Sequence, residues 1–555
     1  MRRIFKIGAF CLCSLCIASC NYLDVEPNEF VTDEDVWSDV RQAEKLVNRV
    51  YSLIDNGGGN GINVAGEITA ATDESKHHWE NPWIWKIAQG GWNPSDNNLD
   101  FWRSRYEDIR IANQFLTNVD NIKFPENEES YWAIKIAQYV GEVRVLRAWF
   151  YYQLLERYGA LPIMTEILGS EDISRLKIPR NSVDEVVNFL VTELQEAADA
   201  LPKVRDNSEK GRMTMGAALA LKAKVLLLNA SPLFNGNTMY ADVKNYDGKQ
   251  LFNQVYDKKK WLLAANAAKA VLDLEEGGMP VYTLADKYHD NPVKNYAYQF
   301  YTRDYDESIL FKIRGNETAV DQALIPNGTT FNGNGKYSVT QEMVDSYEMV
   351  NGYPIKEPGS GYQTEGTQAM TTLFDGISTF RVRNVSKRFI DRDPRFYATI
   401  FFQGTVWRYE ATGRQMHYSY WDNGYNDKEG WPKKGTNCES GYNIRKWCNP
   451  EMNIKPSNSV TTGRIQCFIR LSEVYLMYAE AMNEYQAKPD KEVFDAINKV
   501  RDRVSMPGLP ILETDKTQKG MRARIQNEYK VEFAFENKRF FDVRRWMIAK
   551  DVLGK

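Results

Sequence analysis

The stretch V-R-V-L-R-A-W-F-Y-Y (143–152) indicates how this chain folds, because two later stretches have a similar pattern of small and bulky residues. These are A-L-A-L-K-A-K-V-L-L (218–227) and S-E-V-Y-L-M-Y-A-E-A (472–481). Each mixes small and bulky side chains, so that another helix can approach closely. Repeated helix pairs of this kind predict a tetratricopeptide-like superhelix. An ordinary helical bundle is the alternative, because long insertions interrupt the repeat.

Helical periodicity continues outward from these segments to both ends of the chain. The apolar face over 36–53 predicts a helix N-capped by Thr32 or Asp33, and Pro125 opens a long helix with Gly159 as its C-cap. Further helices are expected at 98–119, 182–200, 214–230 and 257–275, and helical structure returns from Ile465 to Ala549. The residues expected on the inner face of the 98–119 helix are Trp102, Tyr106, Ile109 and Ala112.

The middle of the chain has a different texture, with dense Gly, Pro and Asn and little helical periodicity. T-I-F-F-Q-G-T-V-W-R-Y-E (399–410) and Q-M-H-Y-S-Y-W (415–421) flank A-T-G-R and predict a β-hairpin. The predicted fold is therefore mainly α, with a loop-rich middle lobe that contains small β-hairpins. The expected boundaries are 20–276 for the N-terminal helical lobe, 277–466 for the variable lobe and 467–555 for C-terminal helices that pack back onto the first lobe.

The first nineteen residues are typical of an export signal. Arg2, Arg3 and Lys6 precede an apolar run, Ile7–Ile17, that is far too short to span a bilayer. The small pair before Cys20 resembles a bacterial lipoprotein box, so we expect Cys20 to become the lipid-modified N-terminus of the mature chain. The alternative is an ordinary secretion signal with an incidental cysteine.

The charge of the chain excludes one large class of partner. Of the 70 Lys and Arg residues three lie in the leader, which leaves 67 against 74 Asp and Glu residues in the mature chain. Both signs are interspersed without a basic stripe, whereas nucleic-acid binding needs a concentrated cationic face. We therefore expect no nucleic acid as a partner.

The seven cysteines do not form a disulfide framework, because three of them leave with the leader and Cys20 is expected to be lipidated. Cys438 and Cys448 flank a Gly-containing loop and are the better pair for a disulfide, with Cys467 reduced at the start of a helix. Two loop thiols are the alternative. The four histidines show no metal-ligand spacing, so neither a metal nor another cofactor is expected.

The stretch R-I-Q-N-E-Y-K-V-E-F-A-F-E-N-K-R-F-F-D-V-R-R-W (524–546), called here the closing motif, combines apolar side chains with a dense set of opposite charges. A glycosidase could use two carboxylates such as Glu528 and Glu532. Because so many arginines are interleaved with them, structural ion pairs are the favoured interpretation. The charged residues concerned are Glu528, Glu532, Arg539, Asp542, Arg544 and Arg545.

The closing motif resembles the C-terminal signature of the SusD/RagB family of outer-membrane nutrient-binding lipoproteins. Other matching stretches are R-A-W-F-Y-Y-Q-L-L-E-R-Y-G-A-L-P (147–162), R-M-T-M-G-A-A-L-A-L-K-A-K (212–224), D-P-R-F-Y-A-T-I (393–400), G-Y-N-I-R-K-W (441–447), R-L-S-E-V-Y-L-M-Y-A-E-A (470–481) and I-N-K-V-R-D-R-V-S-M-P (497–507). Family members usually continue for some tens of residues past R-R-W, whereas this sequence stops at Lys555, so its C-terminal completeness stays open.

The resemblance implies a surface lipoprotein on the extracellular face of the outer membrane, with four tetratricopeptide-like units that support a variable lobe. It also implies a partner, a TonB-dependent transporter of the SusC type, on which such proteins sit as a hinged lid. The family has no catalytic residues that could be transferred to this chain, and the chain is therefore not expected to be an enzyme.

Two aromatic clusters are candidates for binding a sugar. A pyranose ring stacks its C–H face on a flat aromatic ring, and its hydroxyls need amides and carboxylates. The first cluster has both, since its tryptophans alternate with asparagines, and the second lies in the predicted hairpin of the variable lobe. In the family, ligand contacts come from these two regions. The residues expected to bind ligand are Trp79, Trp83, Trp92, Asn93, Trp407 and Trp421.

The function expected from the sequence is capture of an oligosaccharide for import. Within the family, the alternative is a peptide-binding protein. Two unrelated alternatives are a surface glycoside hydrolase and a purely structural tetratricopeptide adaptor. No isolated carboxylate pair favours the hydrolase, and the tryptophan-rich loop counts against the adaptor.

Overall fold

The computed structural model describes residues 40–54, 68–77, 82–96, 99–169, 177–304, 306–316, 335–370, 382–402, 406–409, 414–417, 440–449 and 463–554, with Trp37, Val320 and 323–325. Over these residues the fold is mainly α, as the sequence predicts. No helix among them is both long enough and apolar enough to cross a membrane.

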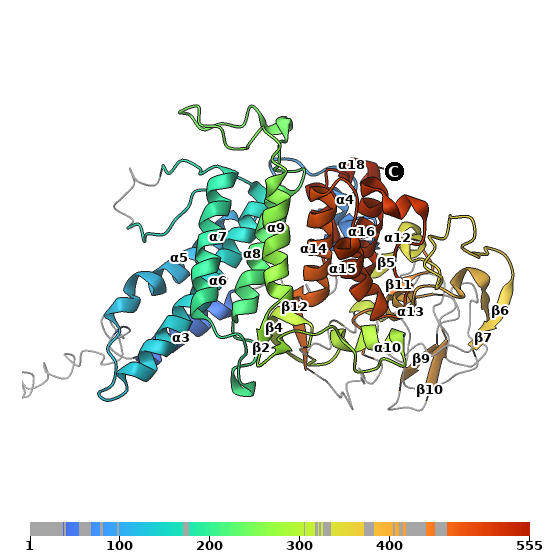
Figure 1. Cartoon of the computed structure of the whole chain (residues 1–555), viewed down its shortest axis with the longest axis horizontal. Helices are drawn as coiled ribbons and strands as arrows, with labels where there is room; N and C mark the ends of the chain where they lie inside the picture. Colours follow the sequence, from blue (N-terminus) through green and yellow to red (C-terminus); the bar gives the residue numbers. More distant parts are fainter. Residues whose placement is uncertain are drawn as a thin grey trace, which may run out of the picture.

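The helices stand side by side in a row that runs through most of the molecule (Figure 1). Each packs on the next: α5 on α6, α6 on α7, α7 on α8 and α8 on α9. α14 then continues the row by packing on α9 and α8, although nearly 200 residues separate it from α9 in the sequence. The bounds are α3 Val40–Ser52, α5 Trp102–Asn118, α6 Glu129–Tyr158, α7 Val183–Ala200, α8 Met215–Ala230, α9 Lys259–Leu272, α14 Leu471–Tyr485, α15 Lys491–Asp502 and α16 Gln518–Glu532.

Capping residues explain why these helices begin and end where they do. Ser182 forms a capping box with Glu185 at the start of α7, and the Thr214 hydroxyl accepts a hydrogen bond from the Ala217 N–H at the start of α8. Gly159 ends α6 with φ at 73°, a conformation that costs glycine little. The C-cap predicted at Gly159 is therefore confirmed.

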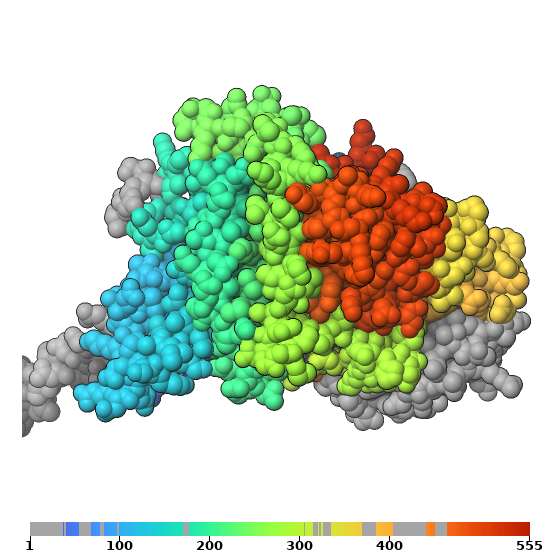
Figure 2. Space-filling model, viewed as in Figure 1, coloured from blue at the N-terminus to red at the C-terminus, as the bar shows by residue number. Residues whose placement is uncertain are grey.

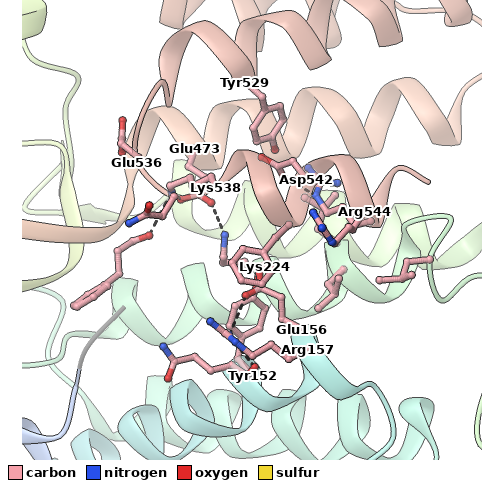
Figure 3. Close-up of a pocket in the computed structure, with 18 of the residues that line it drawn as sticks. Tyr152, Glu156, Arg157, Lys224, Glu473, Tyr529, Glu536, Lys538, Asp542 and Arg544 are labelled. Atoms are coloured by element: carbon pink, nitrogen blue, oxygen red, sulfur yellow. Dashed lines mark hydrogen bonds and ion pairs between the residues drawn. The ribbon is translucent and has the colours of Figure 1, made fainter. Parts of the chain in front are cut away.

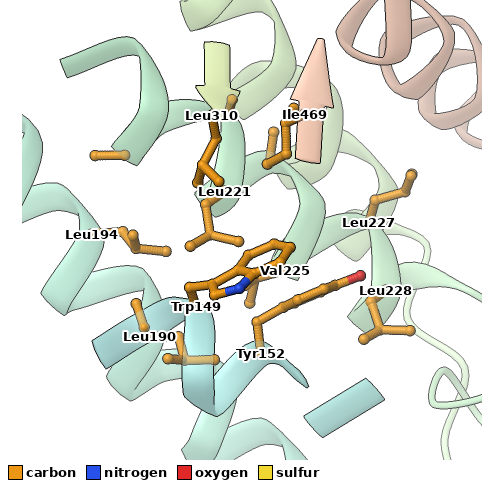
Figure 4. Packing of buried hydrophobic residues seen from close by; sticks show 14 of the residues in the cluster. Trp149, Tyr152, Leu190, Leu194, Leu221, Val225, Leu227, Leu228, Leu310 and Ile469 are labelled. Atoms are coloured by element: carbon orange, nitrogen blue, oxygen red, sulfur yellow. The ribbon is translucent and has the colours of Figure 1, made fainter. Parts of the chain in front are cut away.

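The main hydrophobic core fills the space between the helices and continues under the C-terminal elements (Figure 4). Trp149 of α6 lies between Leu190 of α7 and Val225 of α8 in this layer. Leu310 and Ile469, from two paired strands, cover the same layer from the other side. The space-filling view shows the resulting continuity, because α9 lies directly against the C-terminal helices (Figure 2).

A small sheet, built mostly from the middle of the chain, packs in a second hydrophobic cluster. A four-stranded antiparallel sheet has the order β1-β5-β11-β8, and four strand pairs stand apart from it. Short helices flank these strands. The strands are β1 Ser75–His77, β2 Glu275–Glu276, β3 Met279–Pro280, β4 Ser308–Asn316, β5 Tyr337–Val339, β6 Thr367–Met370, β7 Val382–Ser386, β8 Ile400–Phe401, β9 Val406–Tyr409, β10 Arg414–His417, β11 Asn443–Ile444 and β12 Gly463–Arg470; the short helices are α4 Pro82–Ala88, α10 Pro292–Ala297, α12 Gln341–Ser346 and α13 Pro394–Thr399.

The predicted hairpin is confirmed in a shorter form, since β9 pairs antiparallel with β10. The helical region predicted over Ile465–Ala549 is confirmed except at its start, which is wrong. Gly463–Arg470 is strand β12, which pairs with β4. The rest divides into α14, α15, α16 and two short helices, α17 Arg539–Arg545 and α18 Ala549–Leu553.

The closing motif spans α16 and α17, and its α16 carboxylates are buried in ion pairs. Glu532 accepts from Arg470 at 2.5 Å, from Arg503 at 2.5 Å and from Arg395 at 3.0 Å. Glu528 accepts from Arg395 at 2.5 Å and from Arg501 at 3.0 Å. The three arginines around it hold the pKa of Glu532 well below its usual range, although burial acts to raise it. These contacts bear out the structural interpretation of the two carboxylates, and they bind α16 to α13, β12 and α15.

Candidate ligand-binding surface

The described part of the first aromatic cluster begins on α4, where the sequence pattern predicts a loop. Trp83 lies on this helix and packs against two hydrophobic clusters, so the expectation that Trp83 sits in a loop is wrong. Trp85 is half-buried on the same helix; its indole N–H donates to the His77 carbonyl at 3.2 Å. The Lys76 ammonium lies 5.4 Å from the centre of the Trp85 ring. Both rings therefore fix α4, the helix that precedes the turn with Trp92.

A tight turn follows α4 and is held by side chains of its own. The Gly91 N–H donates to the Lys86 carbonyl at 2.8 Å, and Lys86 also forms an ion pair with Asp96. Asp96 accepts from the Asn93 N–H at 2.9 Å, while the Asn93 side chain accepts from the Ser95 N–H at 3.0 Å. The hydrogen bond from Lys86, together with the one from the Asn93 backbone, lowers the pKa of Asp96. The turn thus has a defined shape and exposes polar groups.

Trp92 lies in the middle of this turn with 42% of its surface exposed. An exposed indole is uncommon, because burying it would remove a large apolar area from water. Here the backbone bonds on both sides fix the turn, while nearly half of the Trp92 surface stays in contact with solvent. Asn93, beside it, is exposed as well. A flat aromatic face with an amide next to it is the arrangement that sugar stacking requires.

Trp102 corrects another expectation, because it is 36% exposed and is not a core residue. It is the first residue of α5, and its ring meets the edge of Tyr158 at 5.3 Å and lies 5.1 Å from Tyr106. Ile109 and Ala112, further along the same face, are buried as expected. Asp100 accepts hydrogen bonds from the Tyr158 hydroxyl at 2.6 Å and from the Trp102 N–H at 3.0 Å. The structure thus adds a second exposed tryptophan to the segment that carries Trp92.

The other predicted site residues are only partly covered by the structure. Trp79, Trp421, Cys20 and Cys438 lie outside the described residues. Trp407 lies on β9, opposite Met416 of β10 in the hairpin register. No group of His, Cys, Asp and Glu side chains in the described ranges could hold a metal ion.

The two described cysteines sit in different surroundings. Cys448 is buried in the second hydrophobic cluster, and its Sγ lies 3.9 Å from the Ile444 carbonyl oxygen. Its predicted disulfide partner, Cys438, is among the residues that the structure does not describe. Cys467 is a free thiol on strand β12, not at the start of a helix. Burial raises the pKa of the Cys467 thiol to about 12.

Comparison with protein families places both ends of the chain in the same group. Residues 280–555 match the model of the SusD family. Residues 21–227 match a related model described as starch-binding and associating with the outer membrane.

Individual relatives agree with these matches over nearly the whole length. SusD-like protein P25 of Formosa agariphila is 24% identical and covers 97% of this chain and 89% of its own length. A SusD-like protein structure from Bacteroides fragilis superposes with a TM-score of 0.72 at 24% identity, covering 94% of this chain and 89% of that one. A laminarin-binding SusD-like protein superposes with a TM-score of 0.60 at 19% identity, covering 93% of this chain and 94% of that one.

The two family models together cover most of the helical row, the lobe with the small sheets and the closing motif. This chain belongs to the SusD/RagB family.

Proposed function

We propose that the protein is an outer-membrane lipoprotein that binds oligosaccharides on the surface around Trp92 and passes them to a TonB-dependent transporter of the SusC type. The family supports this, since one matching model is described as starch-binding and associating with the outer membrane. A structural neighbour is described as laminarin-binding, and another, from Bacteroides fragilis, as a carbohydrate-binding protein.

The observation that carries the proposal is the exposed Trp92 on its braced turn. The ring supplies an apolar platform, and Asn93 supplies an amide for the hydroxyl rim of a sugar. The Lys86–Asp96 ion pair and the backbone bonds hold the turn before any ligand arrives, so little conformational freedom is lost on binding. Trp102 extends the aromatic character of this segment. Trp79, Trp407 and Trp421 remain proposed ligand contacts.

Isothermal titration against a panel of oligosaccharides tests the binding role. We expect a Kd of roughly 10 µM to 1 mM, since each stacked indole contributes on the order of 1 kcal/mol. Trp92→Ala should weaken binding about fivefold or more without changing the melting temperature. Tyr131→Ala, which removes an exposed aromatic ring on the first turn of α6, is the matched control and should bind normally.

The same titration separates the alternative functions. Binding of peptides without binding of any glycan would favour the peptide-binding alternative. Release of product from a bound glycan would show that the protein is an enzyme, contrary to the proposal. In the closing motif Glu528 and Glu532 are both held by arginines, so neither offers a carboxylate free for catalysis.

The anchor and the partner follow from the same reasoning. A binding protein that is tethered through an acylated Cys20 needs a pore to deliver its cargo. We therefore expect co-purification with a TonB-dependent barrel from solubilised outer membranes. Recovery of the lipoprotein alone, under conditions that preserve related complexes, would contradict the role as a lid. Cys20→Ala should release the protein from the membrane fraction.

A further inference from the structure

A cavity of about 430 Å³ lies between α6, α8, α14 and the C-terminal segment that carries α16, α17 and α18 (Figure 3). Its volume is in the range of roughly 300–1,000 Å³ that is typical of sites for small ligands. It is separate from the surface around Trp92, none of whose residues line it. Part of its wall is apolar. The apolar side chains include Trp149, Leu227, Leu228, Leu233, Met477 and Phe541.

One wall of the cavity has two ammonium groups that share a single carboxylate. Glu473 accepts from Lys224 at 2.6 Å and also forms an ion pair with Lys538 (Figure 3). Although burial acts to raise it, these two charges lower the pKa of Glu473 to about 2. The group of three therefore keeps one net positive charge at neutral pH.

Arg544 differs from its neighbours in the closing motif because it has no ion-pair partner among the residues that the structure describes. Its guanidinium donates to the Phe540 carbonyl at 2.7 Å and lies over the Phe540 ring. Burial lowers the pKa of Arg544 to about 10, with no carboxylate to oppose the effect. Arg544 nevertheless stays charged at neutral pH, and it lines the cavity.

A buried hydroxyl also lacks a partner. Tyr529 is 3% exposed and reaches from α16 toward the cavity (Figure 3). Its hydroxyl has no hydrogen-bond partner in the described part of the chain. A buried polar group left unpaired costs roughly 1–3 kcal/mol, so such a group commonly marks a place where a ligand or water belongs.

The carboxylates of the cavity are already engaged. Asp542 accepts from Arg545 at 2.8 Å, and Glu156 accepts from the Tyr152 hydroxyl at 2.8 Å. Glu536 accepts from Arg470 at 2.9 Å. The lining therefore offers donors and positive charge to an incoming group but no unengaged carboxylate.

We propose that this cavity is a second binding site, which takes a small organic acid with an apolar body. The carboxylate would accept hydrogen bonds from Arg544 and from the Tyr529 hydroxyl, while the body would pack on the leucines and Phe541. A neutral sugar fits less well, because the aromatic rings of the lining are engaged with one another: Trp149 is stacked on Tyr152 at 5.8 Å and meets Phe468 at 5.2 Å.

The test is titration of the full chain with N-acetyl-phenylalanine, an acid with an apolar body. Its amide, N-acetyl-phenylalaninamide, has the same body without the charge, and glucuronate has the charge without the body. We expect the acid to bind and both analogues to bind at least tenfold more weakly. Equal binding of the acid and its amide, or no binding of the acid up to millimolar concentration, would overturn the proposal.

Two variants locate the binding in the cavity. Arg544→Gln should weaken binding of the acid about 10- to 100-fold, and Tyr529→Phe about 3- to 10-fold. Arg103→Gln, which changes an exposed arginine on α5, is the control and should bind normally. Unchanged binding by both cavity variants would overturn the site. Glycan binding should be the same in all of these variants, so failure here is distinguishable from failure of the role proposed for Trp92.

Discussion

The two halves of the closing motif are made of similar residues but differ in how their charges are paired. On α16, Glu528 and Glu532 each meet at least two arginines, and all of these groups are buried. On α17, Arg545 has Glu480 and Asp542, whereas its neighbour Arg544 has neither. A network in which every charge is paired holds segments together. A cation beside a cavity that has no carboxylate partner can still bind an anionic ligand. The completeness of pairing, and not the residue type, separates the charges that hold the fold together from Arg544, which is available for binding.

The largest loss of stability is expected when a carboxylate of the fully paired network on α16 is removed. Glu532→Gln keeps the shape of the side chain but leaves Arg470, Arg503 and Arg395 without their shared negative charge. Removing one partner from a buried ion network typically costs about 3–5 kcal/mol. Chemical denaturation should show a loss of this size. A loss below about 1 kcal/mol would show that the network does not stabilise the fold.

A somewhat smaller effect should appear as a dependence on pH. Lys224 and Lys538 lower the pKa of Glu473 from 4.5 to about 2 in the folded protein. The stabilisation from this group is fully present above about pH 4.5 and is lost as the pH falls toward 2, because the unfolded chain takes up the proton first. The shift corresponds to about 3 kcal/mol. In Glu473→Gln, the fall in stability over this range of pH should be smaller than in the unchanged protein.

The smallest effect on stability is expected for Arg544→Gln. This residue has no ion pair to lose among the described residues, and a neutral amide is less costly to bury than a guanidinium. The free energy of unfolding should change by less than about 1 kcal/mol, in contrast to Glu532→Gln. A loss as large as that of Glu532→Gln would mean that Arg544 is structural, and the contrast between the two halves would disappear.

The local features of this fold were open to prediction from sequence. Periodicity and capping residues such as Ser182 and Gly159 depend on neighbours a few positions away, and the helices they define are confirmed. Periodicity does not identify β12, because its short run I-Q-C-F-I (465–469) fits a strand and a buried helix segment equally well. It becomes a strand by pairing with β4, about 150 residues earlier in the chain.

The candidate site shows the same limit. Periodicity correctly places Ile109 and Ala112 toward the core. It cannot show that Trp102, at the start of α5, stays exposed. The residues around the cavity come from segments spread between residues 149 and 550, and nothing in the sequence shows that these segments meet. The closing motif marks Arg544, Arg545 and Asp542 as charged residues, but their pairing cannot be read from their order.

The place of α14 in the helical row has a consequence for the order in which the chain folds. The sides of α8 and α9 that α14 covers are apolar in part, and they emerge from the ribosome long before their partner does. At about 5–20 residues per second, the roughly 200 residues between α9 and α14 take on the order of 10–40 s to synthesise. During that interval the first lobe cannot close its core. Delayed closure leaves the apolar sides of α8 and α9 uncovered, so an N-terminal lobe produced alone should be prone to aggregation.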